Sequence, residues 1–214
     1  ASDWSSDVCS SDLFMINVLQ SDRREQAKYA TEQDLRAAAD YIARDLEEAV
    51  YIYDQEGVER ITDGYATSTC TGGGCDSPPT GSNLPADPNI LPVLVFWRRA
   101  FVPDGIPADL TGGGIEQDDT FVYSLVAYYL IDDENLEWSG SSRIGRFEVR
   151  GGISNPFDLA ADPIKPADPG FRLFDLDVTG DLQTQLNDWY KADEPYDNDD
   201  PIVLVDYIYN SPEP

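Results

Sequence analysis

"DRREQAKYATEQDLRAAADYIARDLEEAV", residues 22–50, is the stretch that decides the fold. Its apolar residues recur at spacings of four, three, four and three positions, namely Leu35, Ala39, Ile42, Leu46 and Ala49. This spacing places them on one face of an α-helix. Along another side, acidic and basic residues alternate at every fourth position from Glu32 to Glu48, which supports a solvated face. The stretch therefore predicts a long amphipathic helix that packs on one side.

Beyond Tyr53 the composition changes. Residues 54–90 are rich in Gly, Pro, Ser and Thr, which predicts a long loop with at most a short strand near Val58–Ile61. Segments rich in β-branched and aromatic residues then predict strands at about 91–101, 120–131, 143–150, 171–176 and 201–209. "GDLQTQLNDWYK", residues 180–191, predicts a short helix.

The order of these segments indicates the fold class. Because the strands follow one another without long helices between them, we expect an antiparallel sheet over residues 91–214. The N-terminal helix, placed at 14–53, would bury its apolar stripe across that sheet. The sequence thus predicts one α+β domain in which a long helix packs on an antiparallel sheet.

The first residues, "ASDWSSDVCSSDL" (1–13), do not resemble a secretory signal, which needs basic residues and then a continuous apolar stretch. A single cysteine among isolated carboxylates also matches no standard metal site. Residues 3–13 can be back-translated directly into the codons of a common sequencing-adapter read. We therefore interpret residues 1–13 as a sequencing-adapter artefact and predict that the authentic chain starts near Phe14.

The chain is strongly acidic, with 41 Asp and Glu against 14 Lys and Arg and a formal net charge of -27. Such a charge disfavours nucleic acid as a partner, because phosphates are bound by basic surfaces. It also disfavours docking on anionic lipid headgroups. The simpler interpretation is solubility through mutual repulsion, in a salty habitat that screens the charge.

Two cysteines, Cys70 and Cys75, lie in "STCTGGGCDSPP". The glycine-rich loop between them can close on a disulfide, which would indicate an oxidising, exocytoplasmic compartment. A pair of free thiols in the cytosol stays open as the alternative. Zinc is disfavoured, because two thiolates would need two further ligands and the sequence has no histidine.

The absence of histidine also excludes Ser-His-Asp and Cys-His catalysis. The sequence contains neither a G-x-S-x-G elbow nor a phosphate-binding P-loop. Paired carboxylates can hydrolyse glycosides, but pairs among 41 acidic residues carry little information. We expect no enzymatic activity, and an acidic glycosidase is kept as a minor alternative.

Clustered carboxylates offer a candidate calcium site, because hard cations prefer several oxygen ligands. The first candidate is "DNDDP", which supplies Asp197, Asp199 and Asp200, and the second is "DDEN" at 132–135. Neither matches an EF-hand loop, and aspartates near turns are usually solvated. Ca²⁺ is therefore the one cofactor that the sequence suggests.

Aromatic residues are frequent in the predicted strands and short helix, and the notable ones are Trp97, Tyr123, Tyr128, Tyr129, Trp138 and Trp189. They can offer flat faces to sugar rings or to a partner. Alternating aromatics in strands mostly fill the core, and we favour that interpretation.

A helix ahead of a loop and an antiparallel sheet resembles type IV pilins and pseudopilins. The strings that sharpen the resemblance are "SDRREQAKYATEQDLRAAADYIARDLEEAVYIYD" (21–54), "LPVLVFWRRAFVP" (91–103), "YSLVAYYLIDD" (123–133), "WSGSSRIGRFEV" (138–149) and "DPGFRLFDL" (168–176). They are similar to the minor pseudopilin, C-type, of cyanobacterial hormogonium polysaccharide secretion. More loosely, the helix is similar to minor pilins of the PilW and type II secretion J kinds.

This resemblance implies a structural subunit anchored in the inner membrane and facing the periplasm. It would join other pilin or pseudopilin subunits in a filament that supports polysaccharide export and gliding motility. Leu35, Ala39, Ile42 and Leu46 would form the assembly face of the helix. In this family a leader is cleaved and an apolar helix follows, so "FMINVL" (14–19) would be the last turns of a membrane helix whose remainder lies upstream.

A second hypothesis belongs to another class of protein. A secreted glycan-binding or calcium-dependent adhesion module would also account for the aromatics and the acidity. It predicts a conventional signal peptide and measurable binding of glycan or Ca²⁺, whereas the pseudopilin hypothesis predicts neither enzymatic turnover nor a cleaved conventional signal.

Overall fold

The computed structural model of the chain describes residues 5–63, 82–108, 117–133, 142–158, 161–198 and 200–208. The chain divides into two compact units, Ala1–Ala43 and Arg44–Pro214. Across the described residues, no helix combines the length and the apolar character needed to cross a bilayer.

The N-terminal helix α1 spans Ser5–Glu47 and contains 43 residues. It includes residues 5–13, whose interpretation as an adapter artefact stays a prediction. Arg44 lies in the last turn, where a cation complements the helix dipole. The helix ends earlier than the predicted 14–53 boundary, because the next residues leave the helix for a strand.

That strand is β1, Ala49–Ile52, which the sequence analysis missed. Two flanking backbone hydrogen bonds fix it to the neighbouring strand: Arg99 N–H donates to Glu48 O (3.0 Å) and Tyr53 N–H donates to Val95 O (2.9 Å). Ala49 continues the helical spacing of apolar residues, but the pairing partner lies far along the chain. Tertiary pairing therefore overrides the local helical pattern here.

Helix α2, Gln55–Asp63, replaces the loop or short strand that was predicted for this part of residues 54–90. Asp54 precedes it and accepts a hydrogen bond from Gly57 N–H at 2.8 Å, as a helix N-cap does. Ile61 on the inner side of α2 is buried. The prediction was wrong because α2 is short and carries an internal glycine, which hides the helical pattern.

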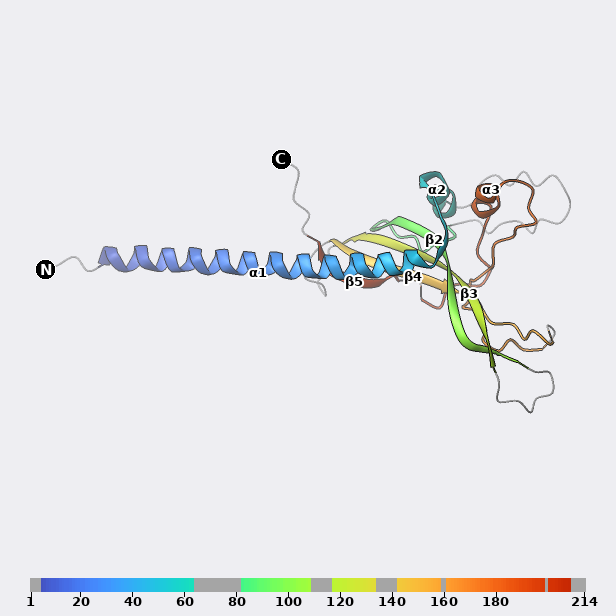
Figure 1. The fold of residues 1–214 in the computed structure, drawn as a ribbon. Coiled ribbons are helices and arrows are strands. Elements are labelled where there is room, and N and C mark those ends of the chain that lie inside the picture. Colours follow the sequence, from blue (N-terminus) through green and yellow to red (C-terminus); the bar gives the residue numbers. More distant parts are fainter. Residues whose placement is uncertain are drawn as a thin grey trace. The chain divides into compact units, whose positions relative to one another are not determined.

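The remaining strands are β2 (Ile90–Pro107), β3 (Gln117–Asp132), β4 (Ser142–Arg150) and β5 (Ile202–Ile208). They form a sheet in the order β1-β2-β3-β4-β5, with every neighbouring pair antiparallel (Figure 1). The prediction of an α+β fold with an antiparallel sheet is confirmed. Four of the five predicted strands are also confirmed in position.

The fifth predicted strand, 171–176, is irregular instead. Its aromatic residues Phe171 and Phe174 pack edge-on against Trp97, with ring centroids 6.2 and 4.9 Å away. Their apolar character therefore serves packing against the sheet rather than strand pairing. The short helix predicted at 180–191 is present as α3, Leu182–Asn187, and is capped by Asp181.

One face of the sheet, the core face, carries the hydrophobic core beneath α2, α3 and the irregular segments. Its buried members are Tyr53, Ile61, Leu84, Val95, Trp97, Leu125, Ala127, Tyr129, Ile131, Phe147, Val149, Leu186 and Trp189. Tyr53 links the layers, because its hydroxyl accepts from Trp97 Nε1 (3.0 Å) and donates to Leu186 O (2.9 Å). The polar atoms of Tyr53 and Trp97 are thus paired within this core.

The opposite face, the network face, carries the alternate residues of β2, β3 and β4. Phe96 and Tyr128 stack on it with nearly parallel rings, and charged residues follow along β4. Beyond the five-stranded part, residues 100–107 of β2 and 117–122 of β3 pair only with each other among the described strands. They form a two-stranded extension, the β2–β3 ribbon (Figure 1).

Candidate functional site

The predicted assembly face lies on α1. Leu35, Ala39 and Ile42 belong to the first unit and Leu46 to the second. Leu35, Ile42 and Leu46 are half-buried, whereas Ala39 is exposed and its neighbour Ala38 is buried. The role of this face in assembly stays a prediction.

The candidate disulfide and calcium residues are only partly described. Cys70, Cys75 and Asp199 lie outside the described residues, while Asp197 and Asp200 are exposed. Among the residues that the structure describes, no three or more potential metal ligands gather in one place. The disulfide and the calcium site therefore stay predictions.

The second calcium candidate begins with two aspartates that have protein partners. Asp133 accepts a hydrogen bond from Arg143 Nη2 at 2.6 Å, and Asp132 accepts one from Ser142 Oγ at 3.2 Å. Arg143 is almost fully buried. Asp133 thus neutralises a buried cation, which is a structural role.

The preference for a core role of the aromatics is confirmed for four of them. Trp97, Tyr128, Tyr129 and Trp189 are all buried. Trp97 and Trp189 lie edge to face with ring centroids 5.6 Å apart. Trp138 lies outside the described residues.

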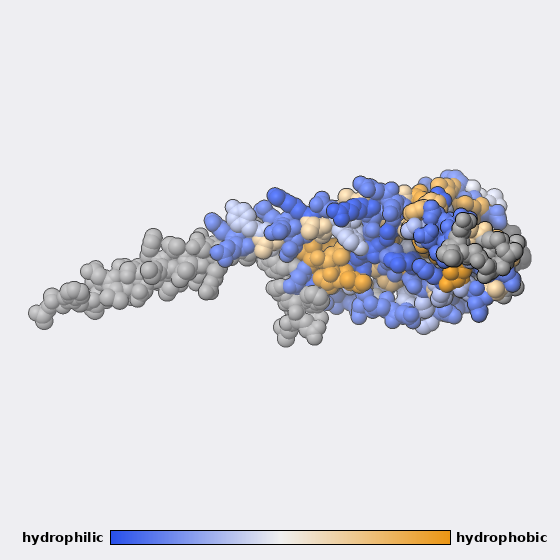
Figure 2. Space-filling model, turned by 60° about the horizontal axis from the view of Figure 1, so that its bottom comes forward, coloured by the Kyte–Doolittle hydropathy of each residue, from blue (hydrophilic) through white to orange (hydrophobic). Residues whose placement is uncertain are grey.

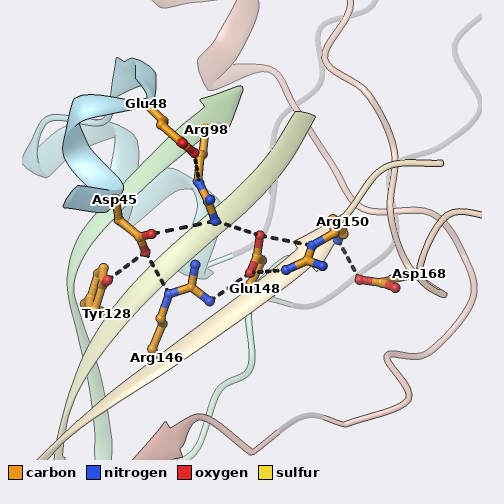
Figure 3. A network of polar contacts seen from close by, with 8 residues as sticks. All are labelled: Asp45, Glu48, Arg98, Tyr128, Arg146, Glu148, Arg150 and Asp168. Atoms are coloured by element: carbon orange, nitrogen blue, oxygen red, sulfur yellow. Dashed lines mark hydrogen bonds and ion pairs between the residues drawn. The ribbon is translucent and has the colours of Figure 1, made fainter. Parts of the chain in front are cut away.

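The structure brings together a charged cluster that the sequence analysis did not identify. This Asp45 network consists of Asp45, Glu48, Arg98, Tyr128, Arg146, Glu148, Arg150 and Asp168 (Figure 3). Its members come from the last turn of α1 and the residue that follows it, from strands β2, β3 and β4, and from the segment after β4. It therefore joins parts of the chain that are far apart in sequence.

Asp45 is the centre of the network on the helix side. Its Oδ2 accepts hydrogen bonds from Tyr128 Oη and Arg146 Nε, both at 2.8 Å, and its Oδ1 lies 3.6 Å from Arg98 Nη1. The side chains of Asp45 and Arg146 are each 9% exposed. A buried carboxylate with two guanidinium partners and a hydroxyl is well compensated for its lost hydration.

Glu148 is the second centre, on β4. Its carboxylate accepts from Arg146 Nη1 at 2.8 Å and from Arg150 Nη2 at 3.0 Å, and it lies 3.5 Å from Arg98 Nη1. Arg98 also donates from Nε to Glu48 Oε2 at 2.6 Å. The positive charges of Arg98, Arg146 and Arg150 thus balance the negative charges of Asp45, Glu48 and Glu148 (Figure 3).

The environment shifts the acid–base equilibria of the network. Burial raises the pKa of Glu148, but the hydrogen bonds from Arg150 and Arg146 outweigh it and lower the pKa to about 2. Burial lowers the pKa of Arg146, and the bonds to Asp45 and Glu148 outweigh it, so that the pKa is raised. Burial raises the pKa of the Tyr128 hydroxyl, and its hydrogen bond to Asp45 raises it further.

These shifts indicate what the network can do. A general acid or base works best with a pKa near the operating pH, whereas Glu148 and Arg146 are held in their charged forms far from neutrality. Arg150 also donates from both Nε (3.3 Å) and Nη2 (3.0 Å) to Glu148, and this bidentate contact fixes its guanidinium group in position. The arrangement suits a fixed electrostatic joint between the end of α1 and three strands of the sheet.

A sequence signal for this joint exists. In "RFEVR" (146–150) charged and apolar residues alternate strictly, so Arg146, Glu148 and Arg150 share one face of a strand. Asp45 lies three positions after Ile42, on the side of the helix that carries the apolar stripe. The pattern predicts a charged strand face, but not that these elements meet.

Comparison with known proteins adds no further constraint. No family model, no curated protein and no solved structure matches the chain.

Proposed function

We propose that the chain is a minor pseudopilin, a structural subunit of a type IV pilus-like or type II secretion-like apparatus for polysaccharide export and gliding motility. The resemblance of its strings to the C-type hormogonium pseudopilin suggests this function. In this proposal the chain acts by assembly rather than by chemical turnover.

The observation that carries the proposal is the joint between helix and sheet. A helix of 43 residues precedes the antiparallel sheet, and Asp45 in its last turn bonds to Tyr128 and Arg146 on central strands. A filament subunit has to transmit force from its helix to its outer domain. A buried, charge-balanced joint at that point suits such a load, because breaking it would expose unpaired charges.

The proposal also assigns a location and partners. An apolar segment upstream of Phe14 would anchor the protein in the inner membrane, and the sheet would face the periplasm. The partners would be other pilin or pseudopilin subunits of the same filament, with polysaccharide as the exported material. A disulfide between Cys70 and Cys75 would fit that compartment.

Recovery of the native DNA upstream of the Phe14 codon is the first test. A short leader that ends in glycine, followed by about 20 apolar residues with an early glutamate, supports the pseudopilin proposal. A conventional signal peptide joined to Phe14 contradicts it and favours the secreted glycan- or calcium-binding module.

A variant of the helix tests assembly directly. Ile42→Asp places a charge on the proposed assembly face, so we expect it to abolish filament incorporation and polysaccharide export in the source organism. The matched control is Gln33→Asp, which adds the same charge at an exposed position of the same helix. Normal folding and normal export in Ile42→Asp would count decisively against the assembly role.

A further inference from the structure

The β2–β3 ribbon carries an exposed aromatic pair. Phe101 and Phe121 are cross-strand partners, and their rings lie edge to face with centroids 5.5 Å apart. The two side chains are 53% and 45% exposed, although phenylalanine is usually among the most buried residue types. The guanidinium carbon of Arg99 lies over the Phe121 ring, 3.7 Å from its centroid. The three side chains therefore share one face of the ribbon, the aromatic face.

Opposite charges flank this pair on the aromatic face. Arg99 precedes Phe101 by two residues on β2, and Asp119 precedes Phe121 by two residues on β3, so each shares the face of its phenylalanine. Because the strands are antiparallel, the two charged residues lie on opposite sides of the pair, each about 7 Å along its strand. Both side chains are exposed, and within the described part of the chain neither forms an ion pair.

This arrangement is complementary to itself. A two-fold axis that is parallel to the aromatic face, and runs across the strands at the phenylalanine pair, brings the pairs of two copies together. The same rotation reverses the direction of the strands, so Arg99 of each copy meets Asp119 of the other copy. An isologous contact of this kind makes every interaction twice. The phenylalanine rings at its centre are then flanked by two ion pairs, as the apolar centre of an interface is surrounded by a polar rim.

The β2 edge of the ribbon is less suited to docking than its face. Pro103 and Pro107 lack the N–H group that an added strand would need, and the strand pairing is irregular next to them. Asp104 has a positive φ of 52° in this irregular part, and its N–H donates to Asp119 Oδ1 at 3.1 Å. These features favour docking on the aromatic face over strand addition at the β2 edge.

We propose that the aromatic face of the β2–β3 ribbon is a self-association surface, on which a second copy of this chain docks about a two-fold axis. The charge pattern favours this occupant, because a uniformly basic partner would repel Arg99 and a uniformly acidic one would repel Asp119. An anionic membrane is disfavoured, because the three charged residues in 100–107 and 117–122 are all acidic. The inference requires neither an anchor nor a filament, so it does not rest on the pseudopilin proposal.

The proposed dimer is weak, and salt favours it. The ribbon is two strands wide, so the contact is smaller than the roughly 1,200–2,000 Å² of a standard interface. Two chains that each carry a net charge of -27 also repel one another at long range. Salt screens this long-range repulsion more strongly than it screens charges in contact, so we expect the tightest association at about 0.5 M NaCl.

The test is sedimentation equilibrium of the 214-residue chain with a reducing agent, at protein concentrations up to about 1 mM. We expect a reversible equilibrium between monomer and dimer. Phe101→Ala weakens the dimer at least about tenfold, because both copies lose a ring at the centre of the contact. The matched control is Phe157→Ala, which removes another exposed phenylalanine and leaves the dissociation constant unchanged.

Charge reversal distinguishes this contact from non-specific association. Arg99→Asp and Asp119→Arg each place like charges opposite one another across the axis, so each variant alone is monomeric. An equimolar mixture of the two forms heterodimers, because opposite charges then meet again. Asp118→Arg makes the same change in charge on the other face of β3 and leaves the dimer intact. Far-UV circular dichroism checks the fold of every variant, and if Asp119→Arg does not fold, Phe101→Ala and Arg99→Asp decide.

Three results would overturn the inference. A chain that is monomeric at every concentration assigns the phenylalanine pair to a partner of another kind. Association that persists in Phe101→Ala places the contact elsewhere on the chain. A mixture of folded charge variants that does not associate contradicts the two-fold arrangement. Because filament incorporation is not measured here, a failure of this test leaves the pseudopilin proposal standing, and the reverse also holds.

Discussion

Arg146 connects the two carboxylate centres of the Asp45 network. Its Nε donates to Asp45 Oδ2 and its Nη1 donates to Glu148 Oε2, both at 2.8 Å (Figure 3). Removing one partner of a buried ion pair leaves an uncompensated charge, which costs far more than the net value of the pair. The stability of the joint is therefore most sensitive at this residue.

We expect Arg146→Met to lower the free energy of unfolding by about 3–5 kcal/mol, because Asp45 and Glu148 lose a shared partner at nearly unchanged side-chain volume. Urea unfolding followed by far-UV circular dichroism measures the change. The control is Arg36→Met, whose side chain is 82% exposed and pairs only weakly with Glu32 at 3.8 Å. That variant should lose less than about 1 kcal/mol, and an equally small loss for Arg146→Met would contradict the structural role of the network.

The pKa of Glu148 makes a prediction about acid stability. Its pKa is lowered from 4.5 to about 2 in the folded chain. A carboxyl group with a depressed pKa adds stability that is complete above pH 4.5 and is lost as the pH falls towards 2. The shift corresponds to about 3 kcal/mol.

The expected result is a difference in unfolding free energy between the wild type and Glu148→Gln that is constant above pH 5 and shrinks between pH 4.5 and 2. Comparing the two proteins removes the effect of the other carboxylates, whose protonation also relieves repulsion. Chemical unfolding at several pH values measures the difference. A difference that does not change over this range would show that Glu148 is not held by its arginines.

At the scale of elements, α2 illustrates how a helix is placed by its packing. Gly57 lies inside it, and a Cβ atom at this position would lie 2.7 Å from Asn187 Oδ1 and 2.8 Å from Tyr53 Cδ1. Both neighbours are buried, so they cannot move away easily. The glycine allows α2 to approach Tyr53 and α3 closely, although glycine itself disfavours a helix.

Gly57→Ala should therefore destabilise the chain by about 1–3 kcal/mol through overpacking, although alanine is the better helix former. Glu59→Ala, at an exposed position of the same helix, serves as the control and should change stability by less than about 0.5 kcal/mol. Urea unfolding measures both variants. A stabilised Gly57→Ala variant would mean that α2 does not pack as closely as described.

At the scale of the whole molecule, the net charge of -27 is the dominant property. Hydrophilic residues cover most of the described surface that faces the viewer in Figure 2, with separate hydrophobic patches. Uncompensated surface carboxylates repel one another and destabilise the compact state. Salt screens this repulsion, because the Debye length falls from about 30 Å at 0.01 M to about 10 Å at 0.1 M.

We expect the melting temperature to rise as NaCl is increased from 0.01 to 0.5 M, measured in the presence of a chelator so that calcium does not contribute. A triple variant, Asp193→Asn, Asp197→Asn and Asp200→Asn, removes three exposed charges and should show a smaller rise. A melting temperature that falls with salt would indicate that attractive ion pairs outweigh the surface repulsion.

The local sequence pattern predicts the positions of most strands. The runs of β-branched and aromatic residues located β2, β3, β4 and β5, and the spacing of apolar residues located α3. These signals are local, because a strand or a helix must bury one side of itself wherever it lies. The aromatics of β2 and β3 were expected in the core for the same reason, and Trp97 and Tyr129 are buried there.

Other features depend on contacts between residues that are distant in the sequence, so the local sequence pattern does not predict them. β1 forms because Glu48 and Tyr53 bond to β2, and α2 forms where Asp54 caps a short helix that packs on the core. The Asp45 network exists only because three strands and the C-terminal end of α1 meet.

The sequence by itself determined the net charge of the chain, the exclusion of catalysis that needs histidine, and the antiparallel sheet. These follow from residue type and short-range spacing. Only the tertiary structure decided which of the 41 acidic residues are buried beside arginines and which stay in water. The physical reason is that the energy of a carboxylate depends on its burial and on the cations near it. The fold determines both, and the neighbouring residues in the sequence do not.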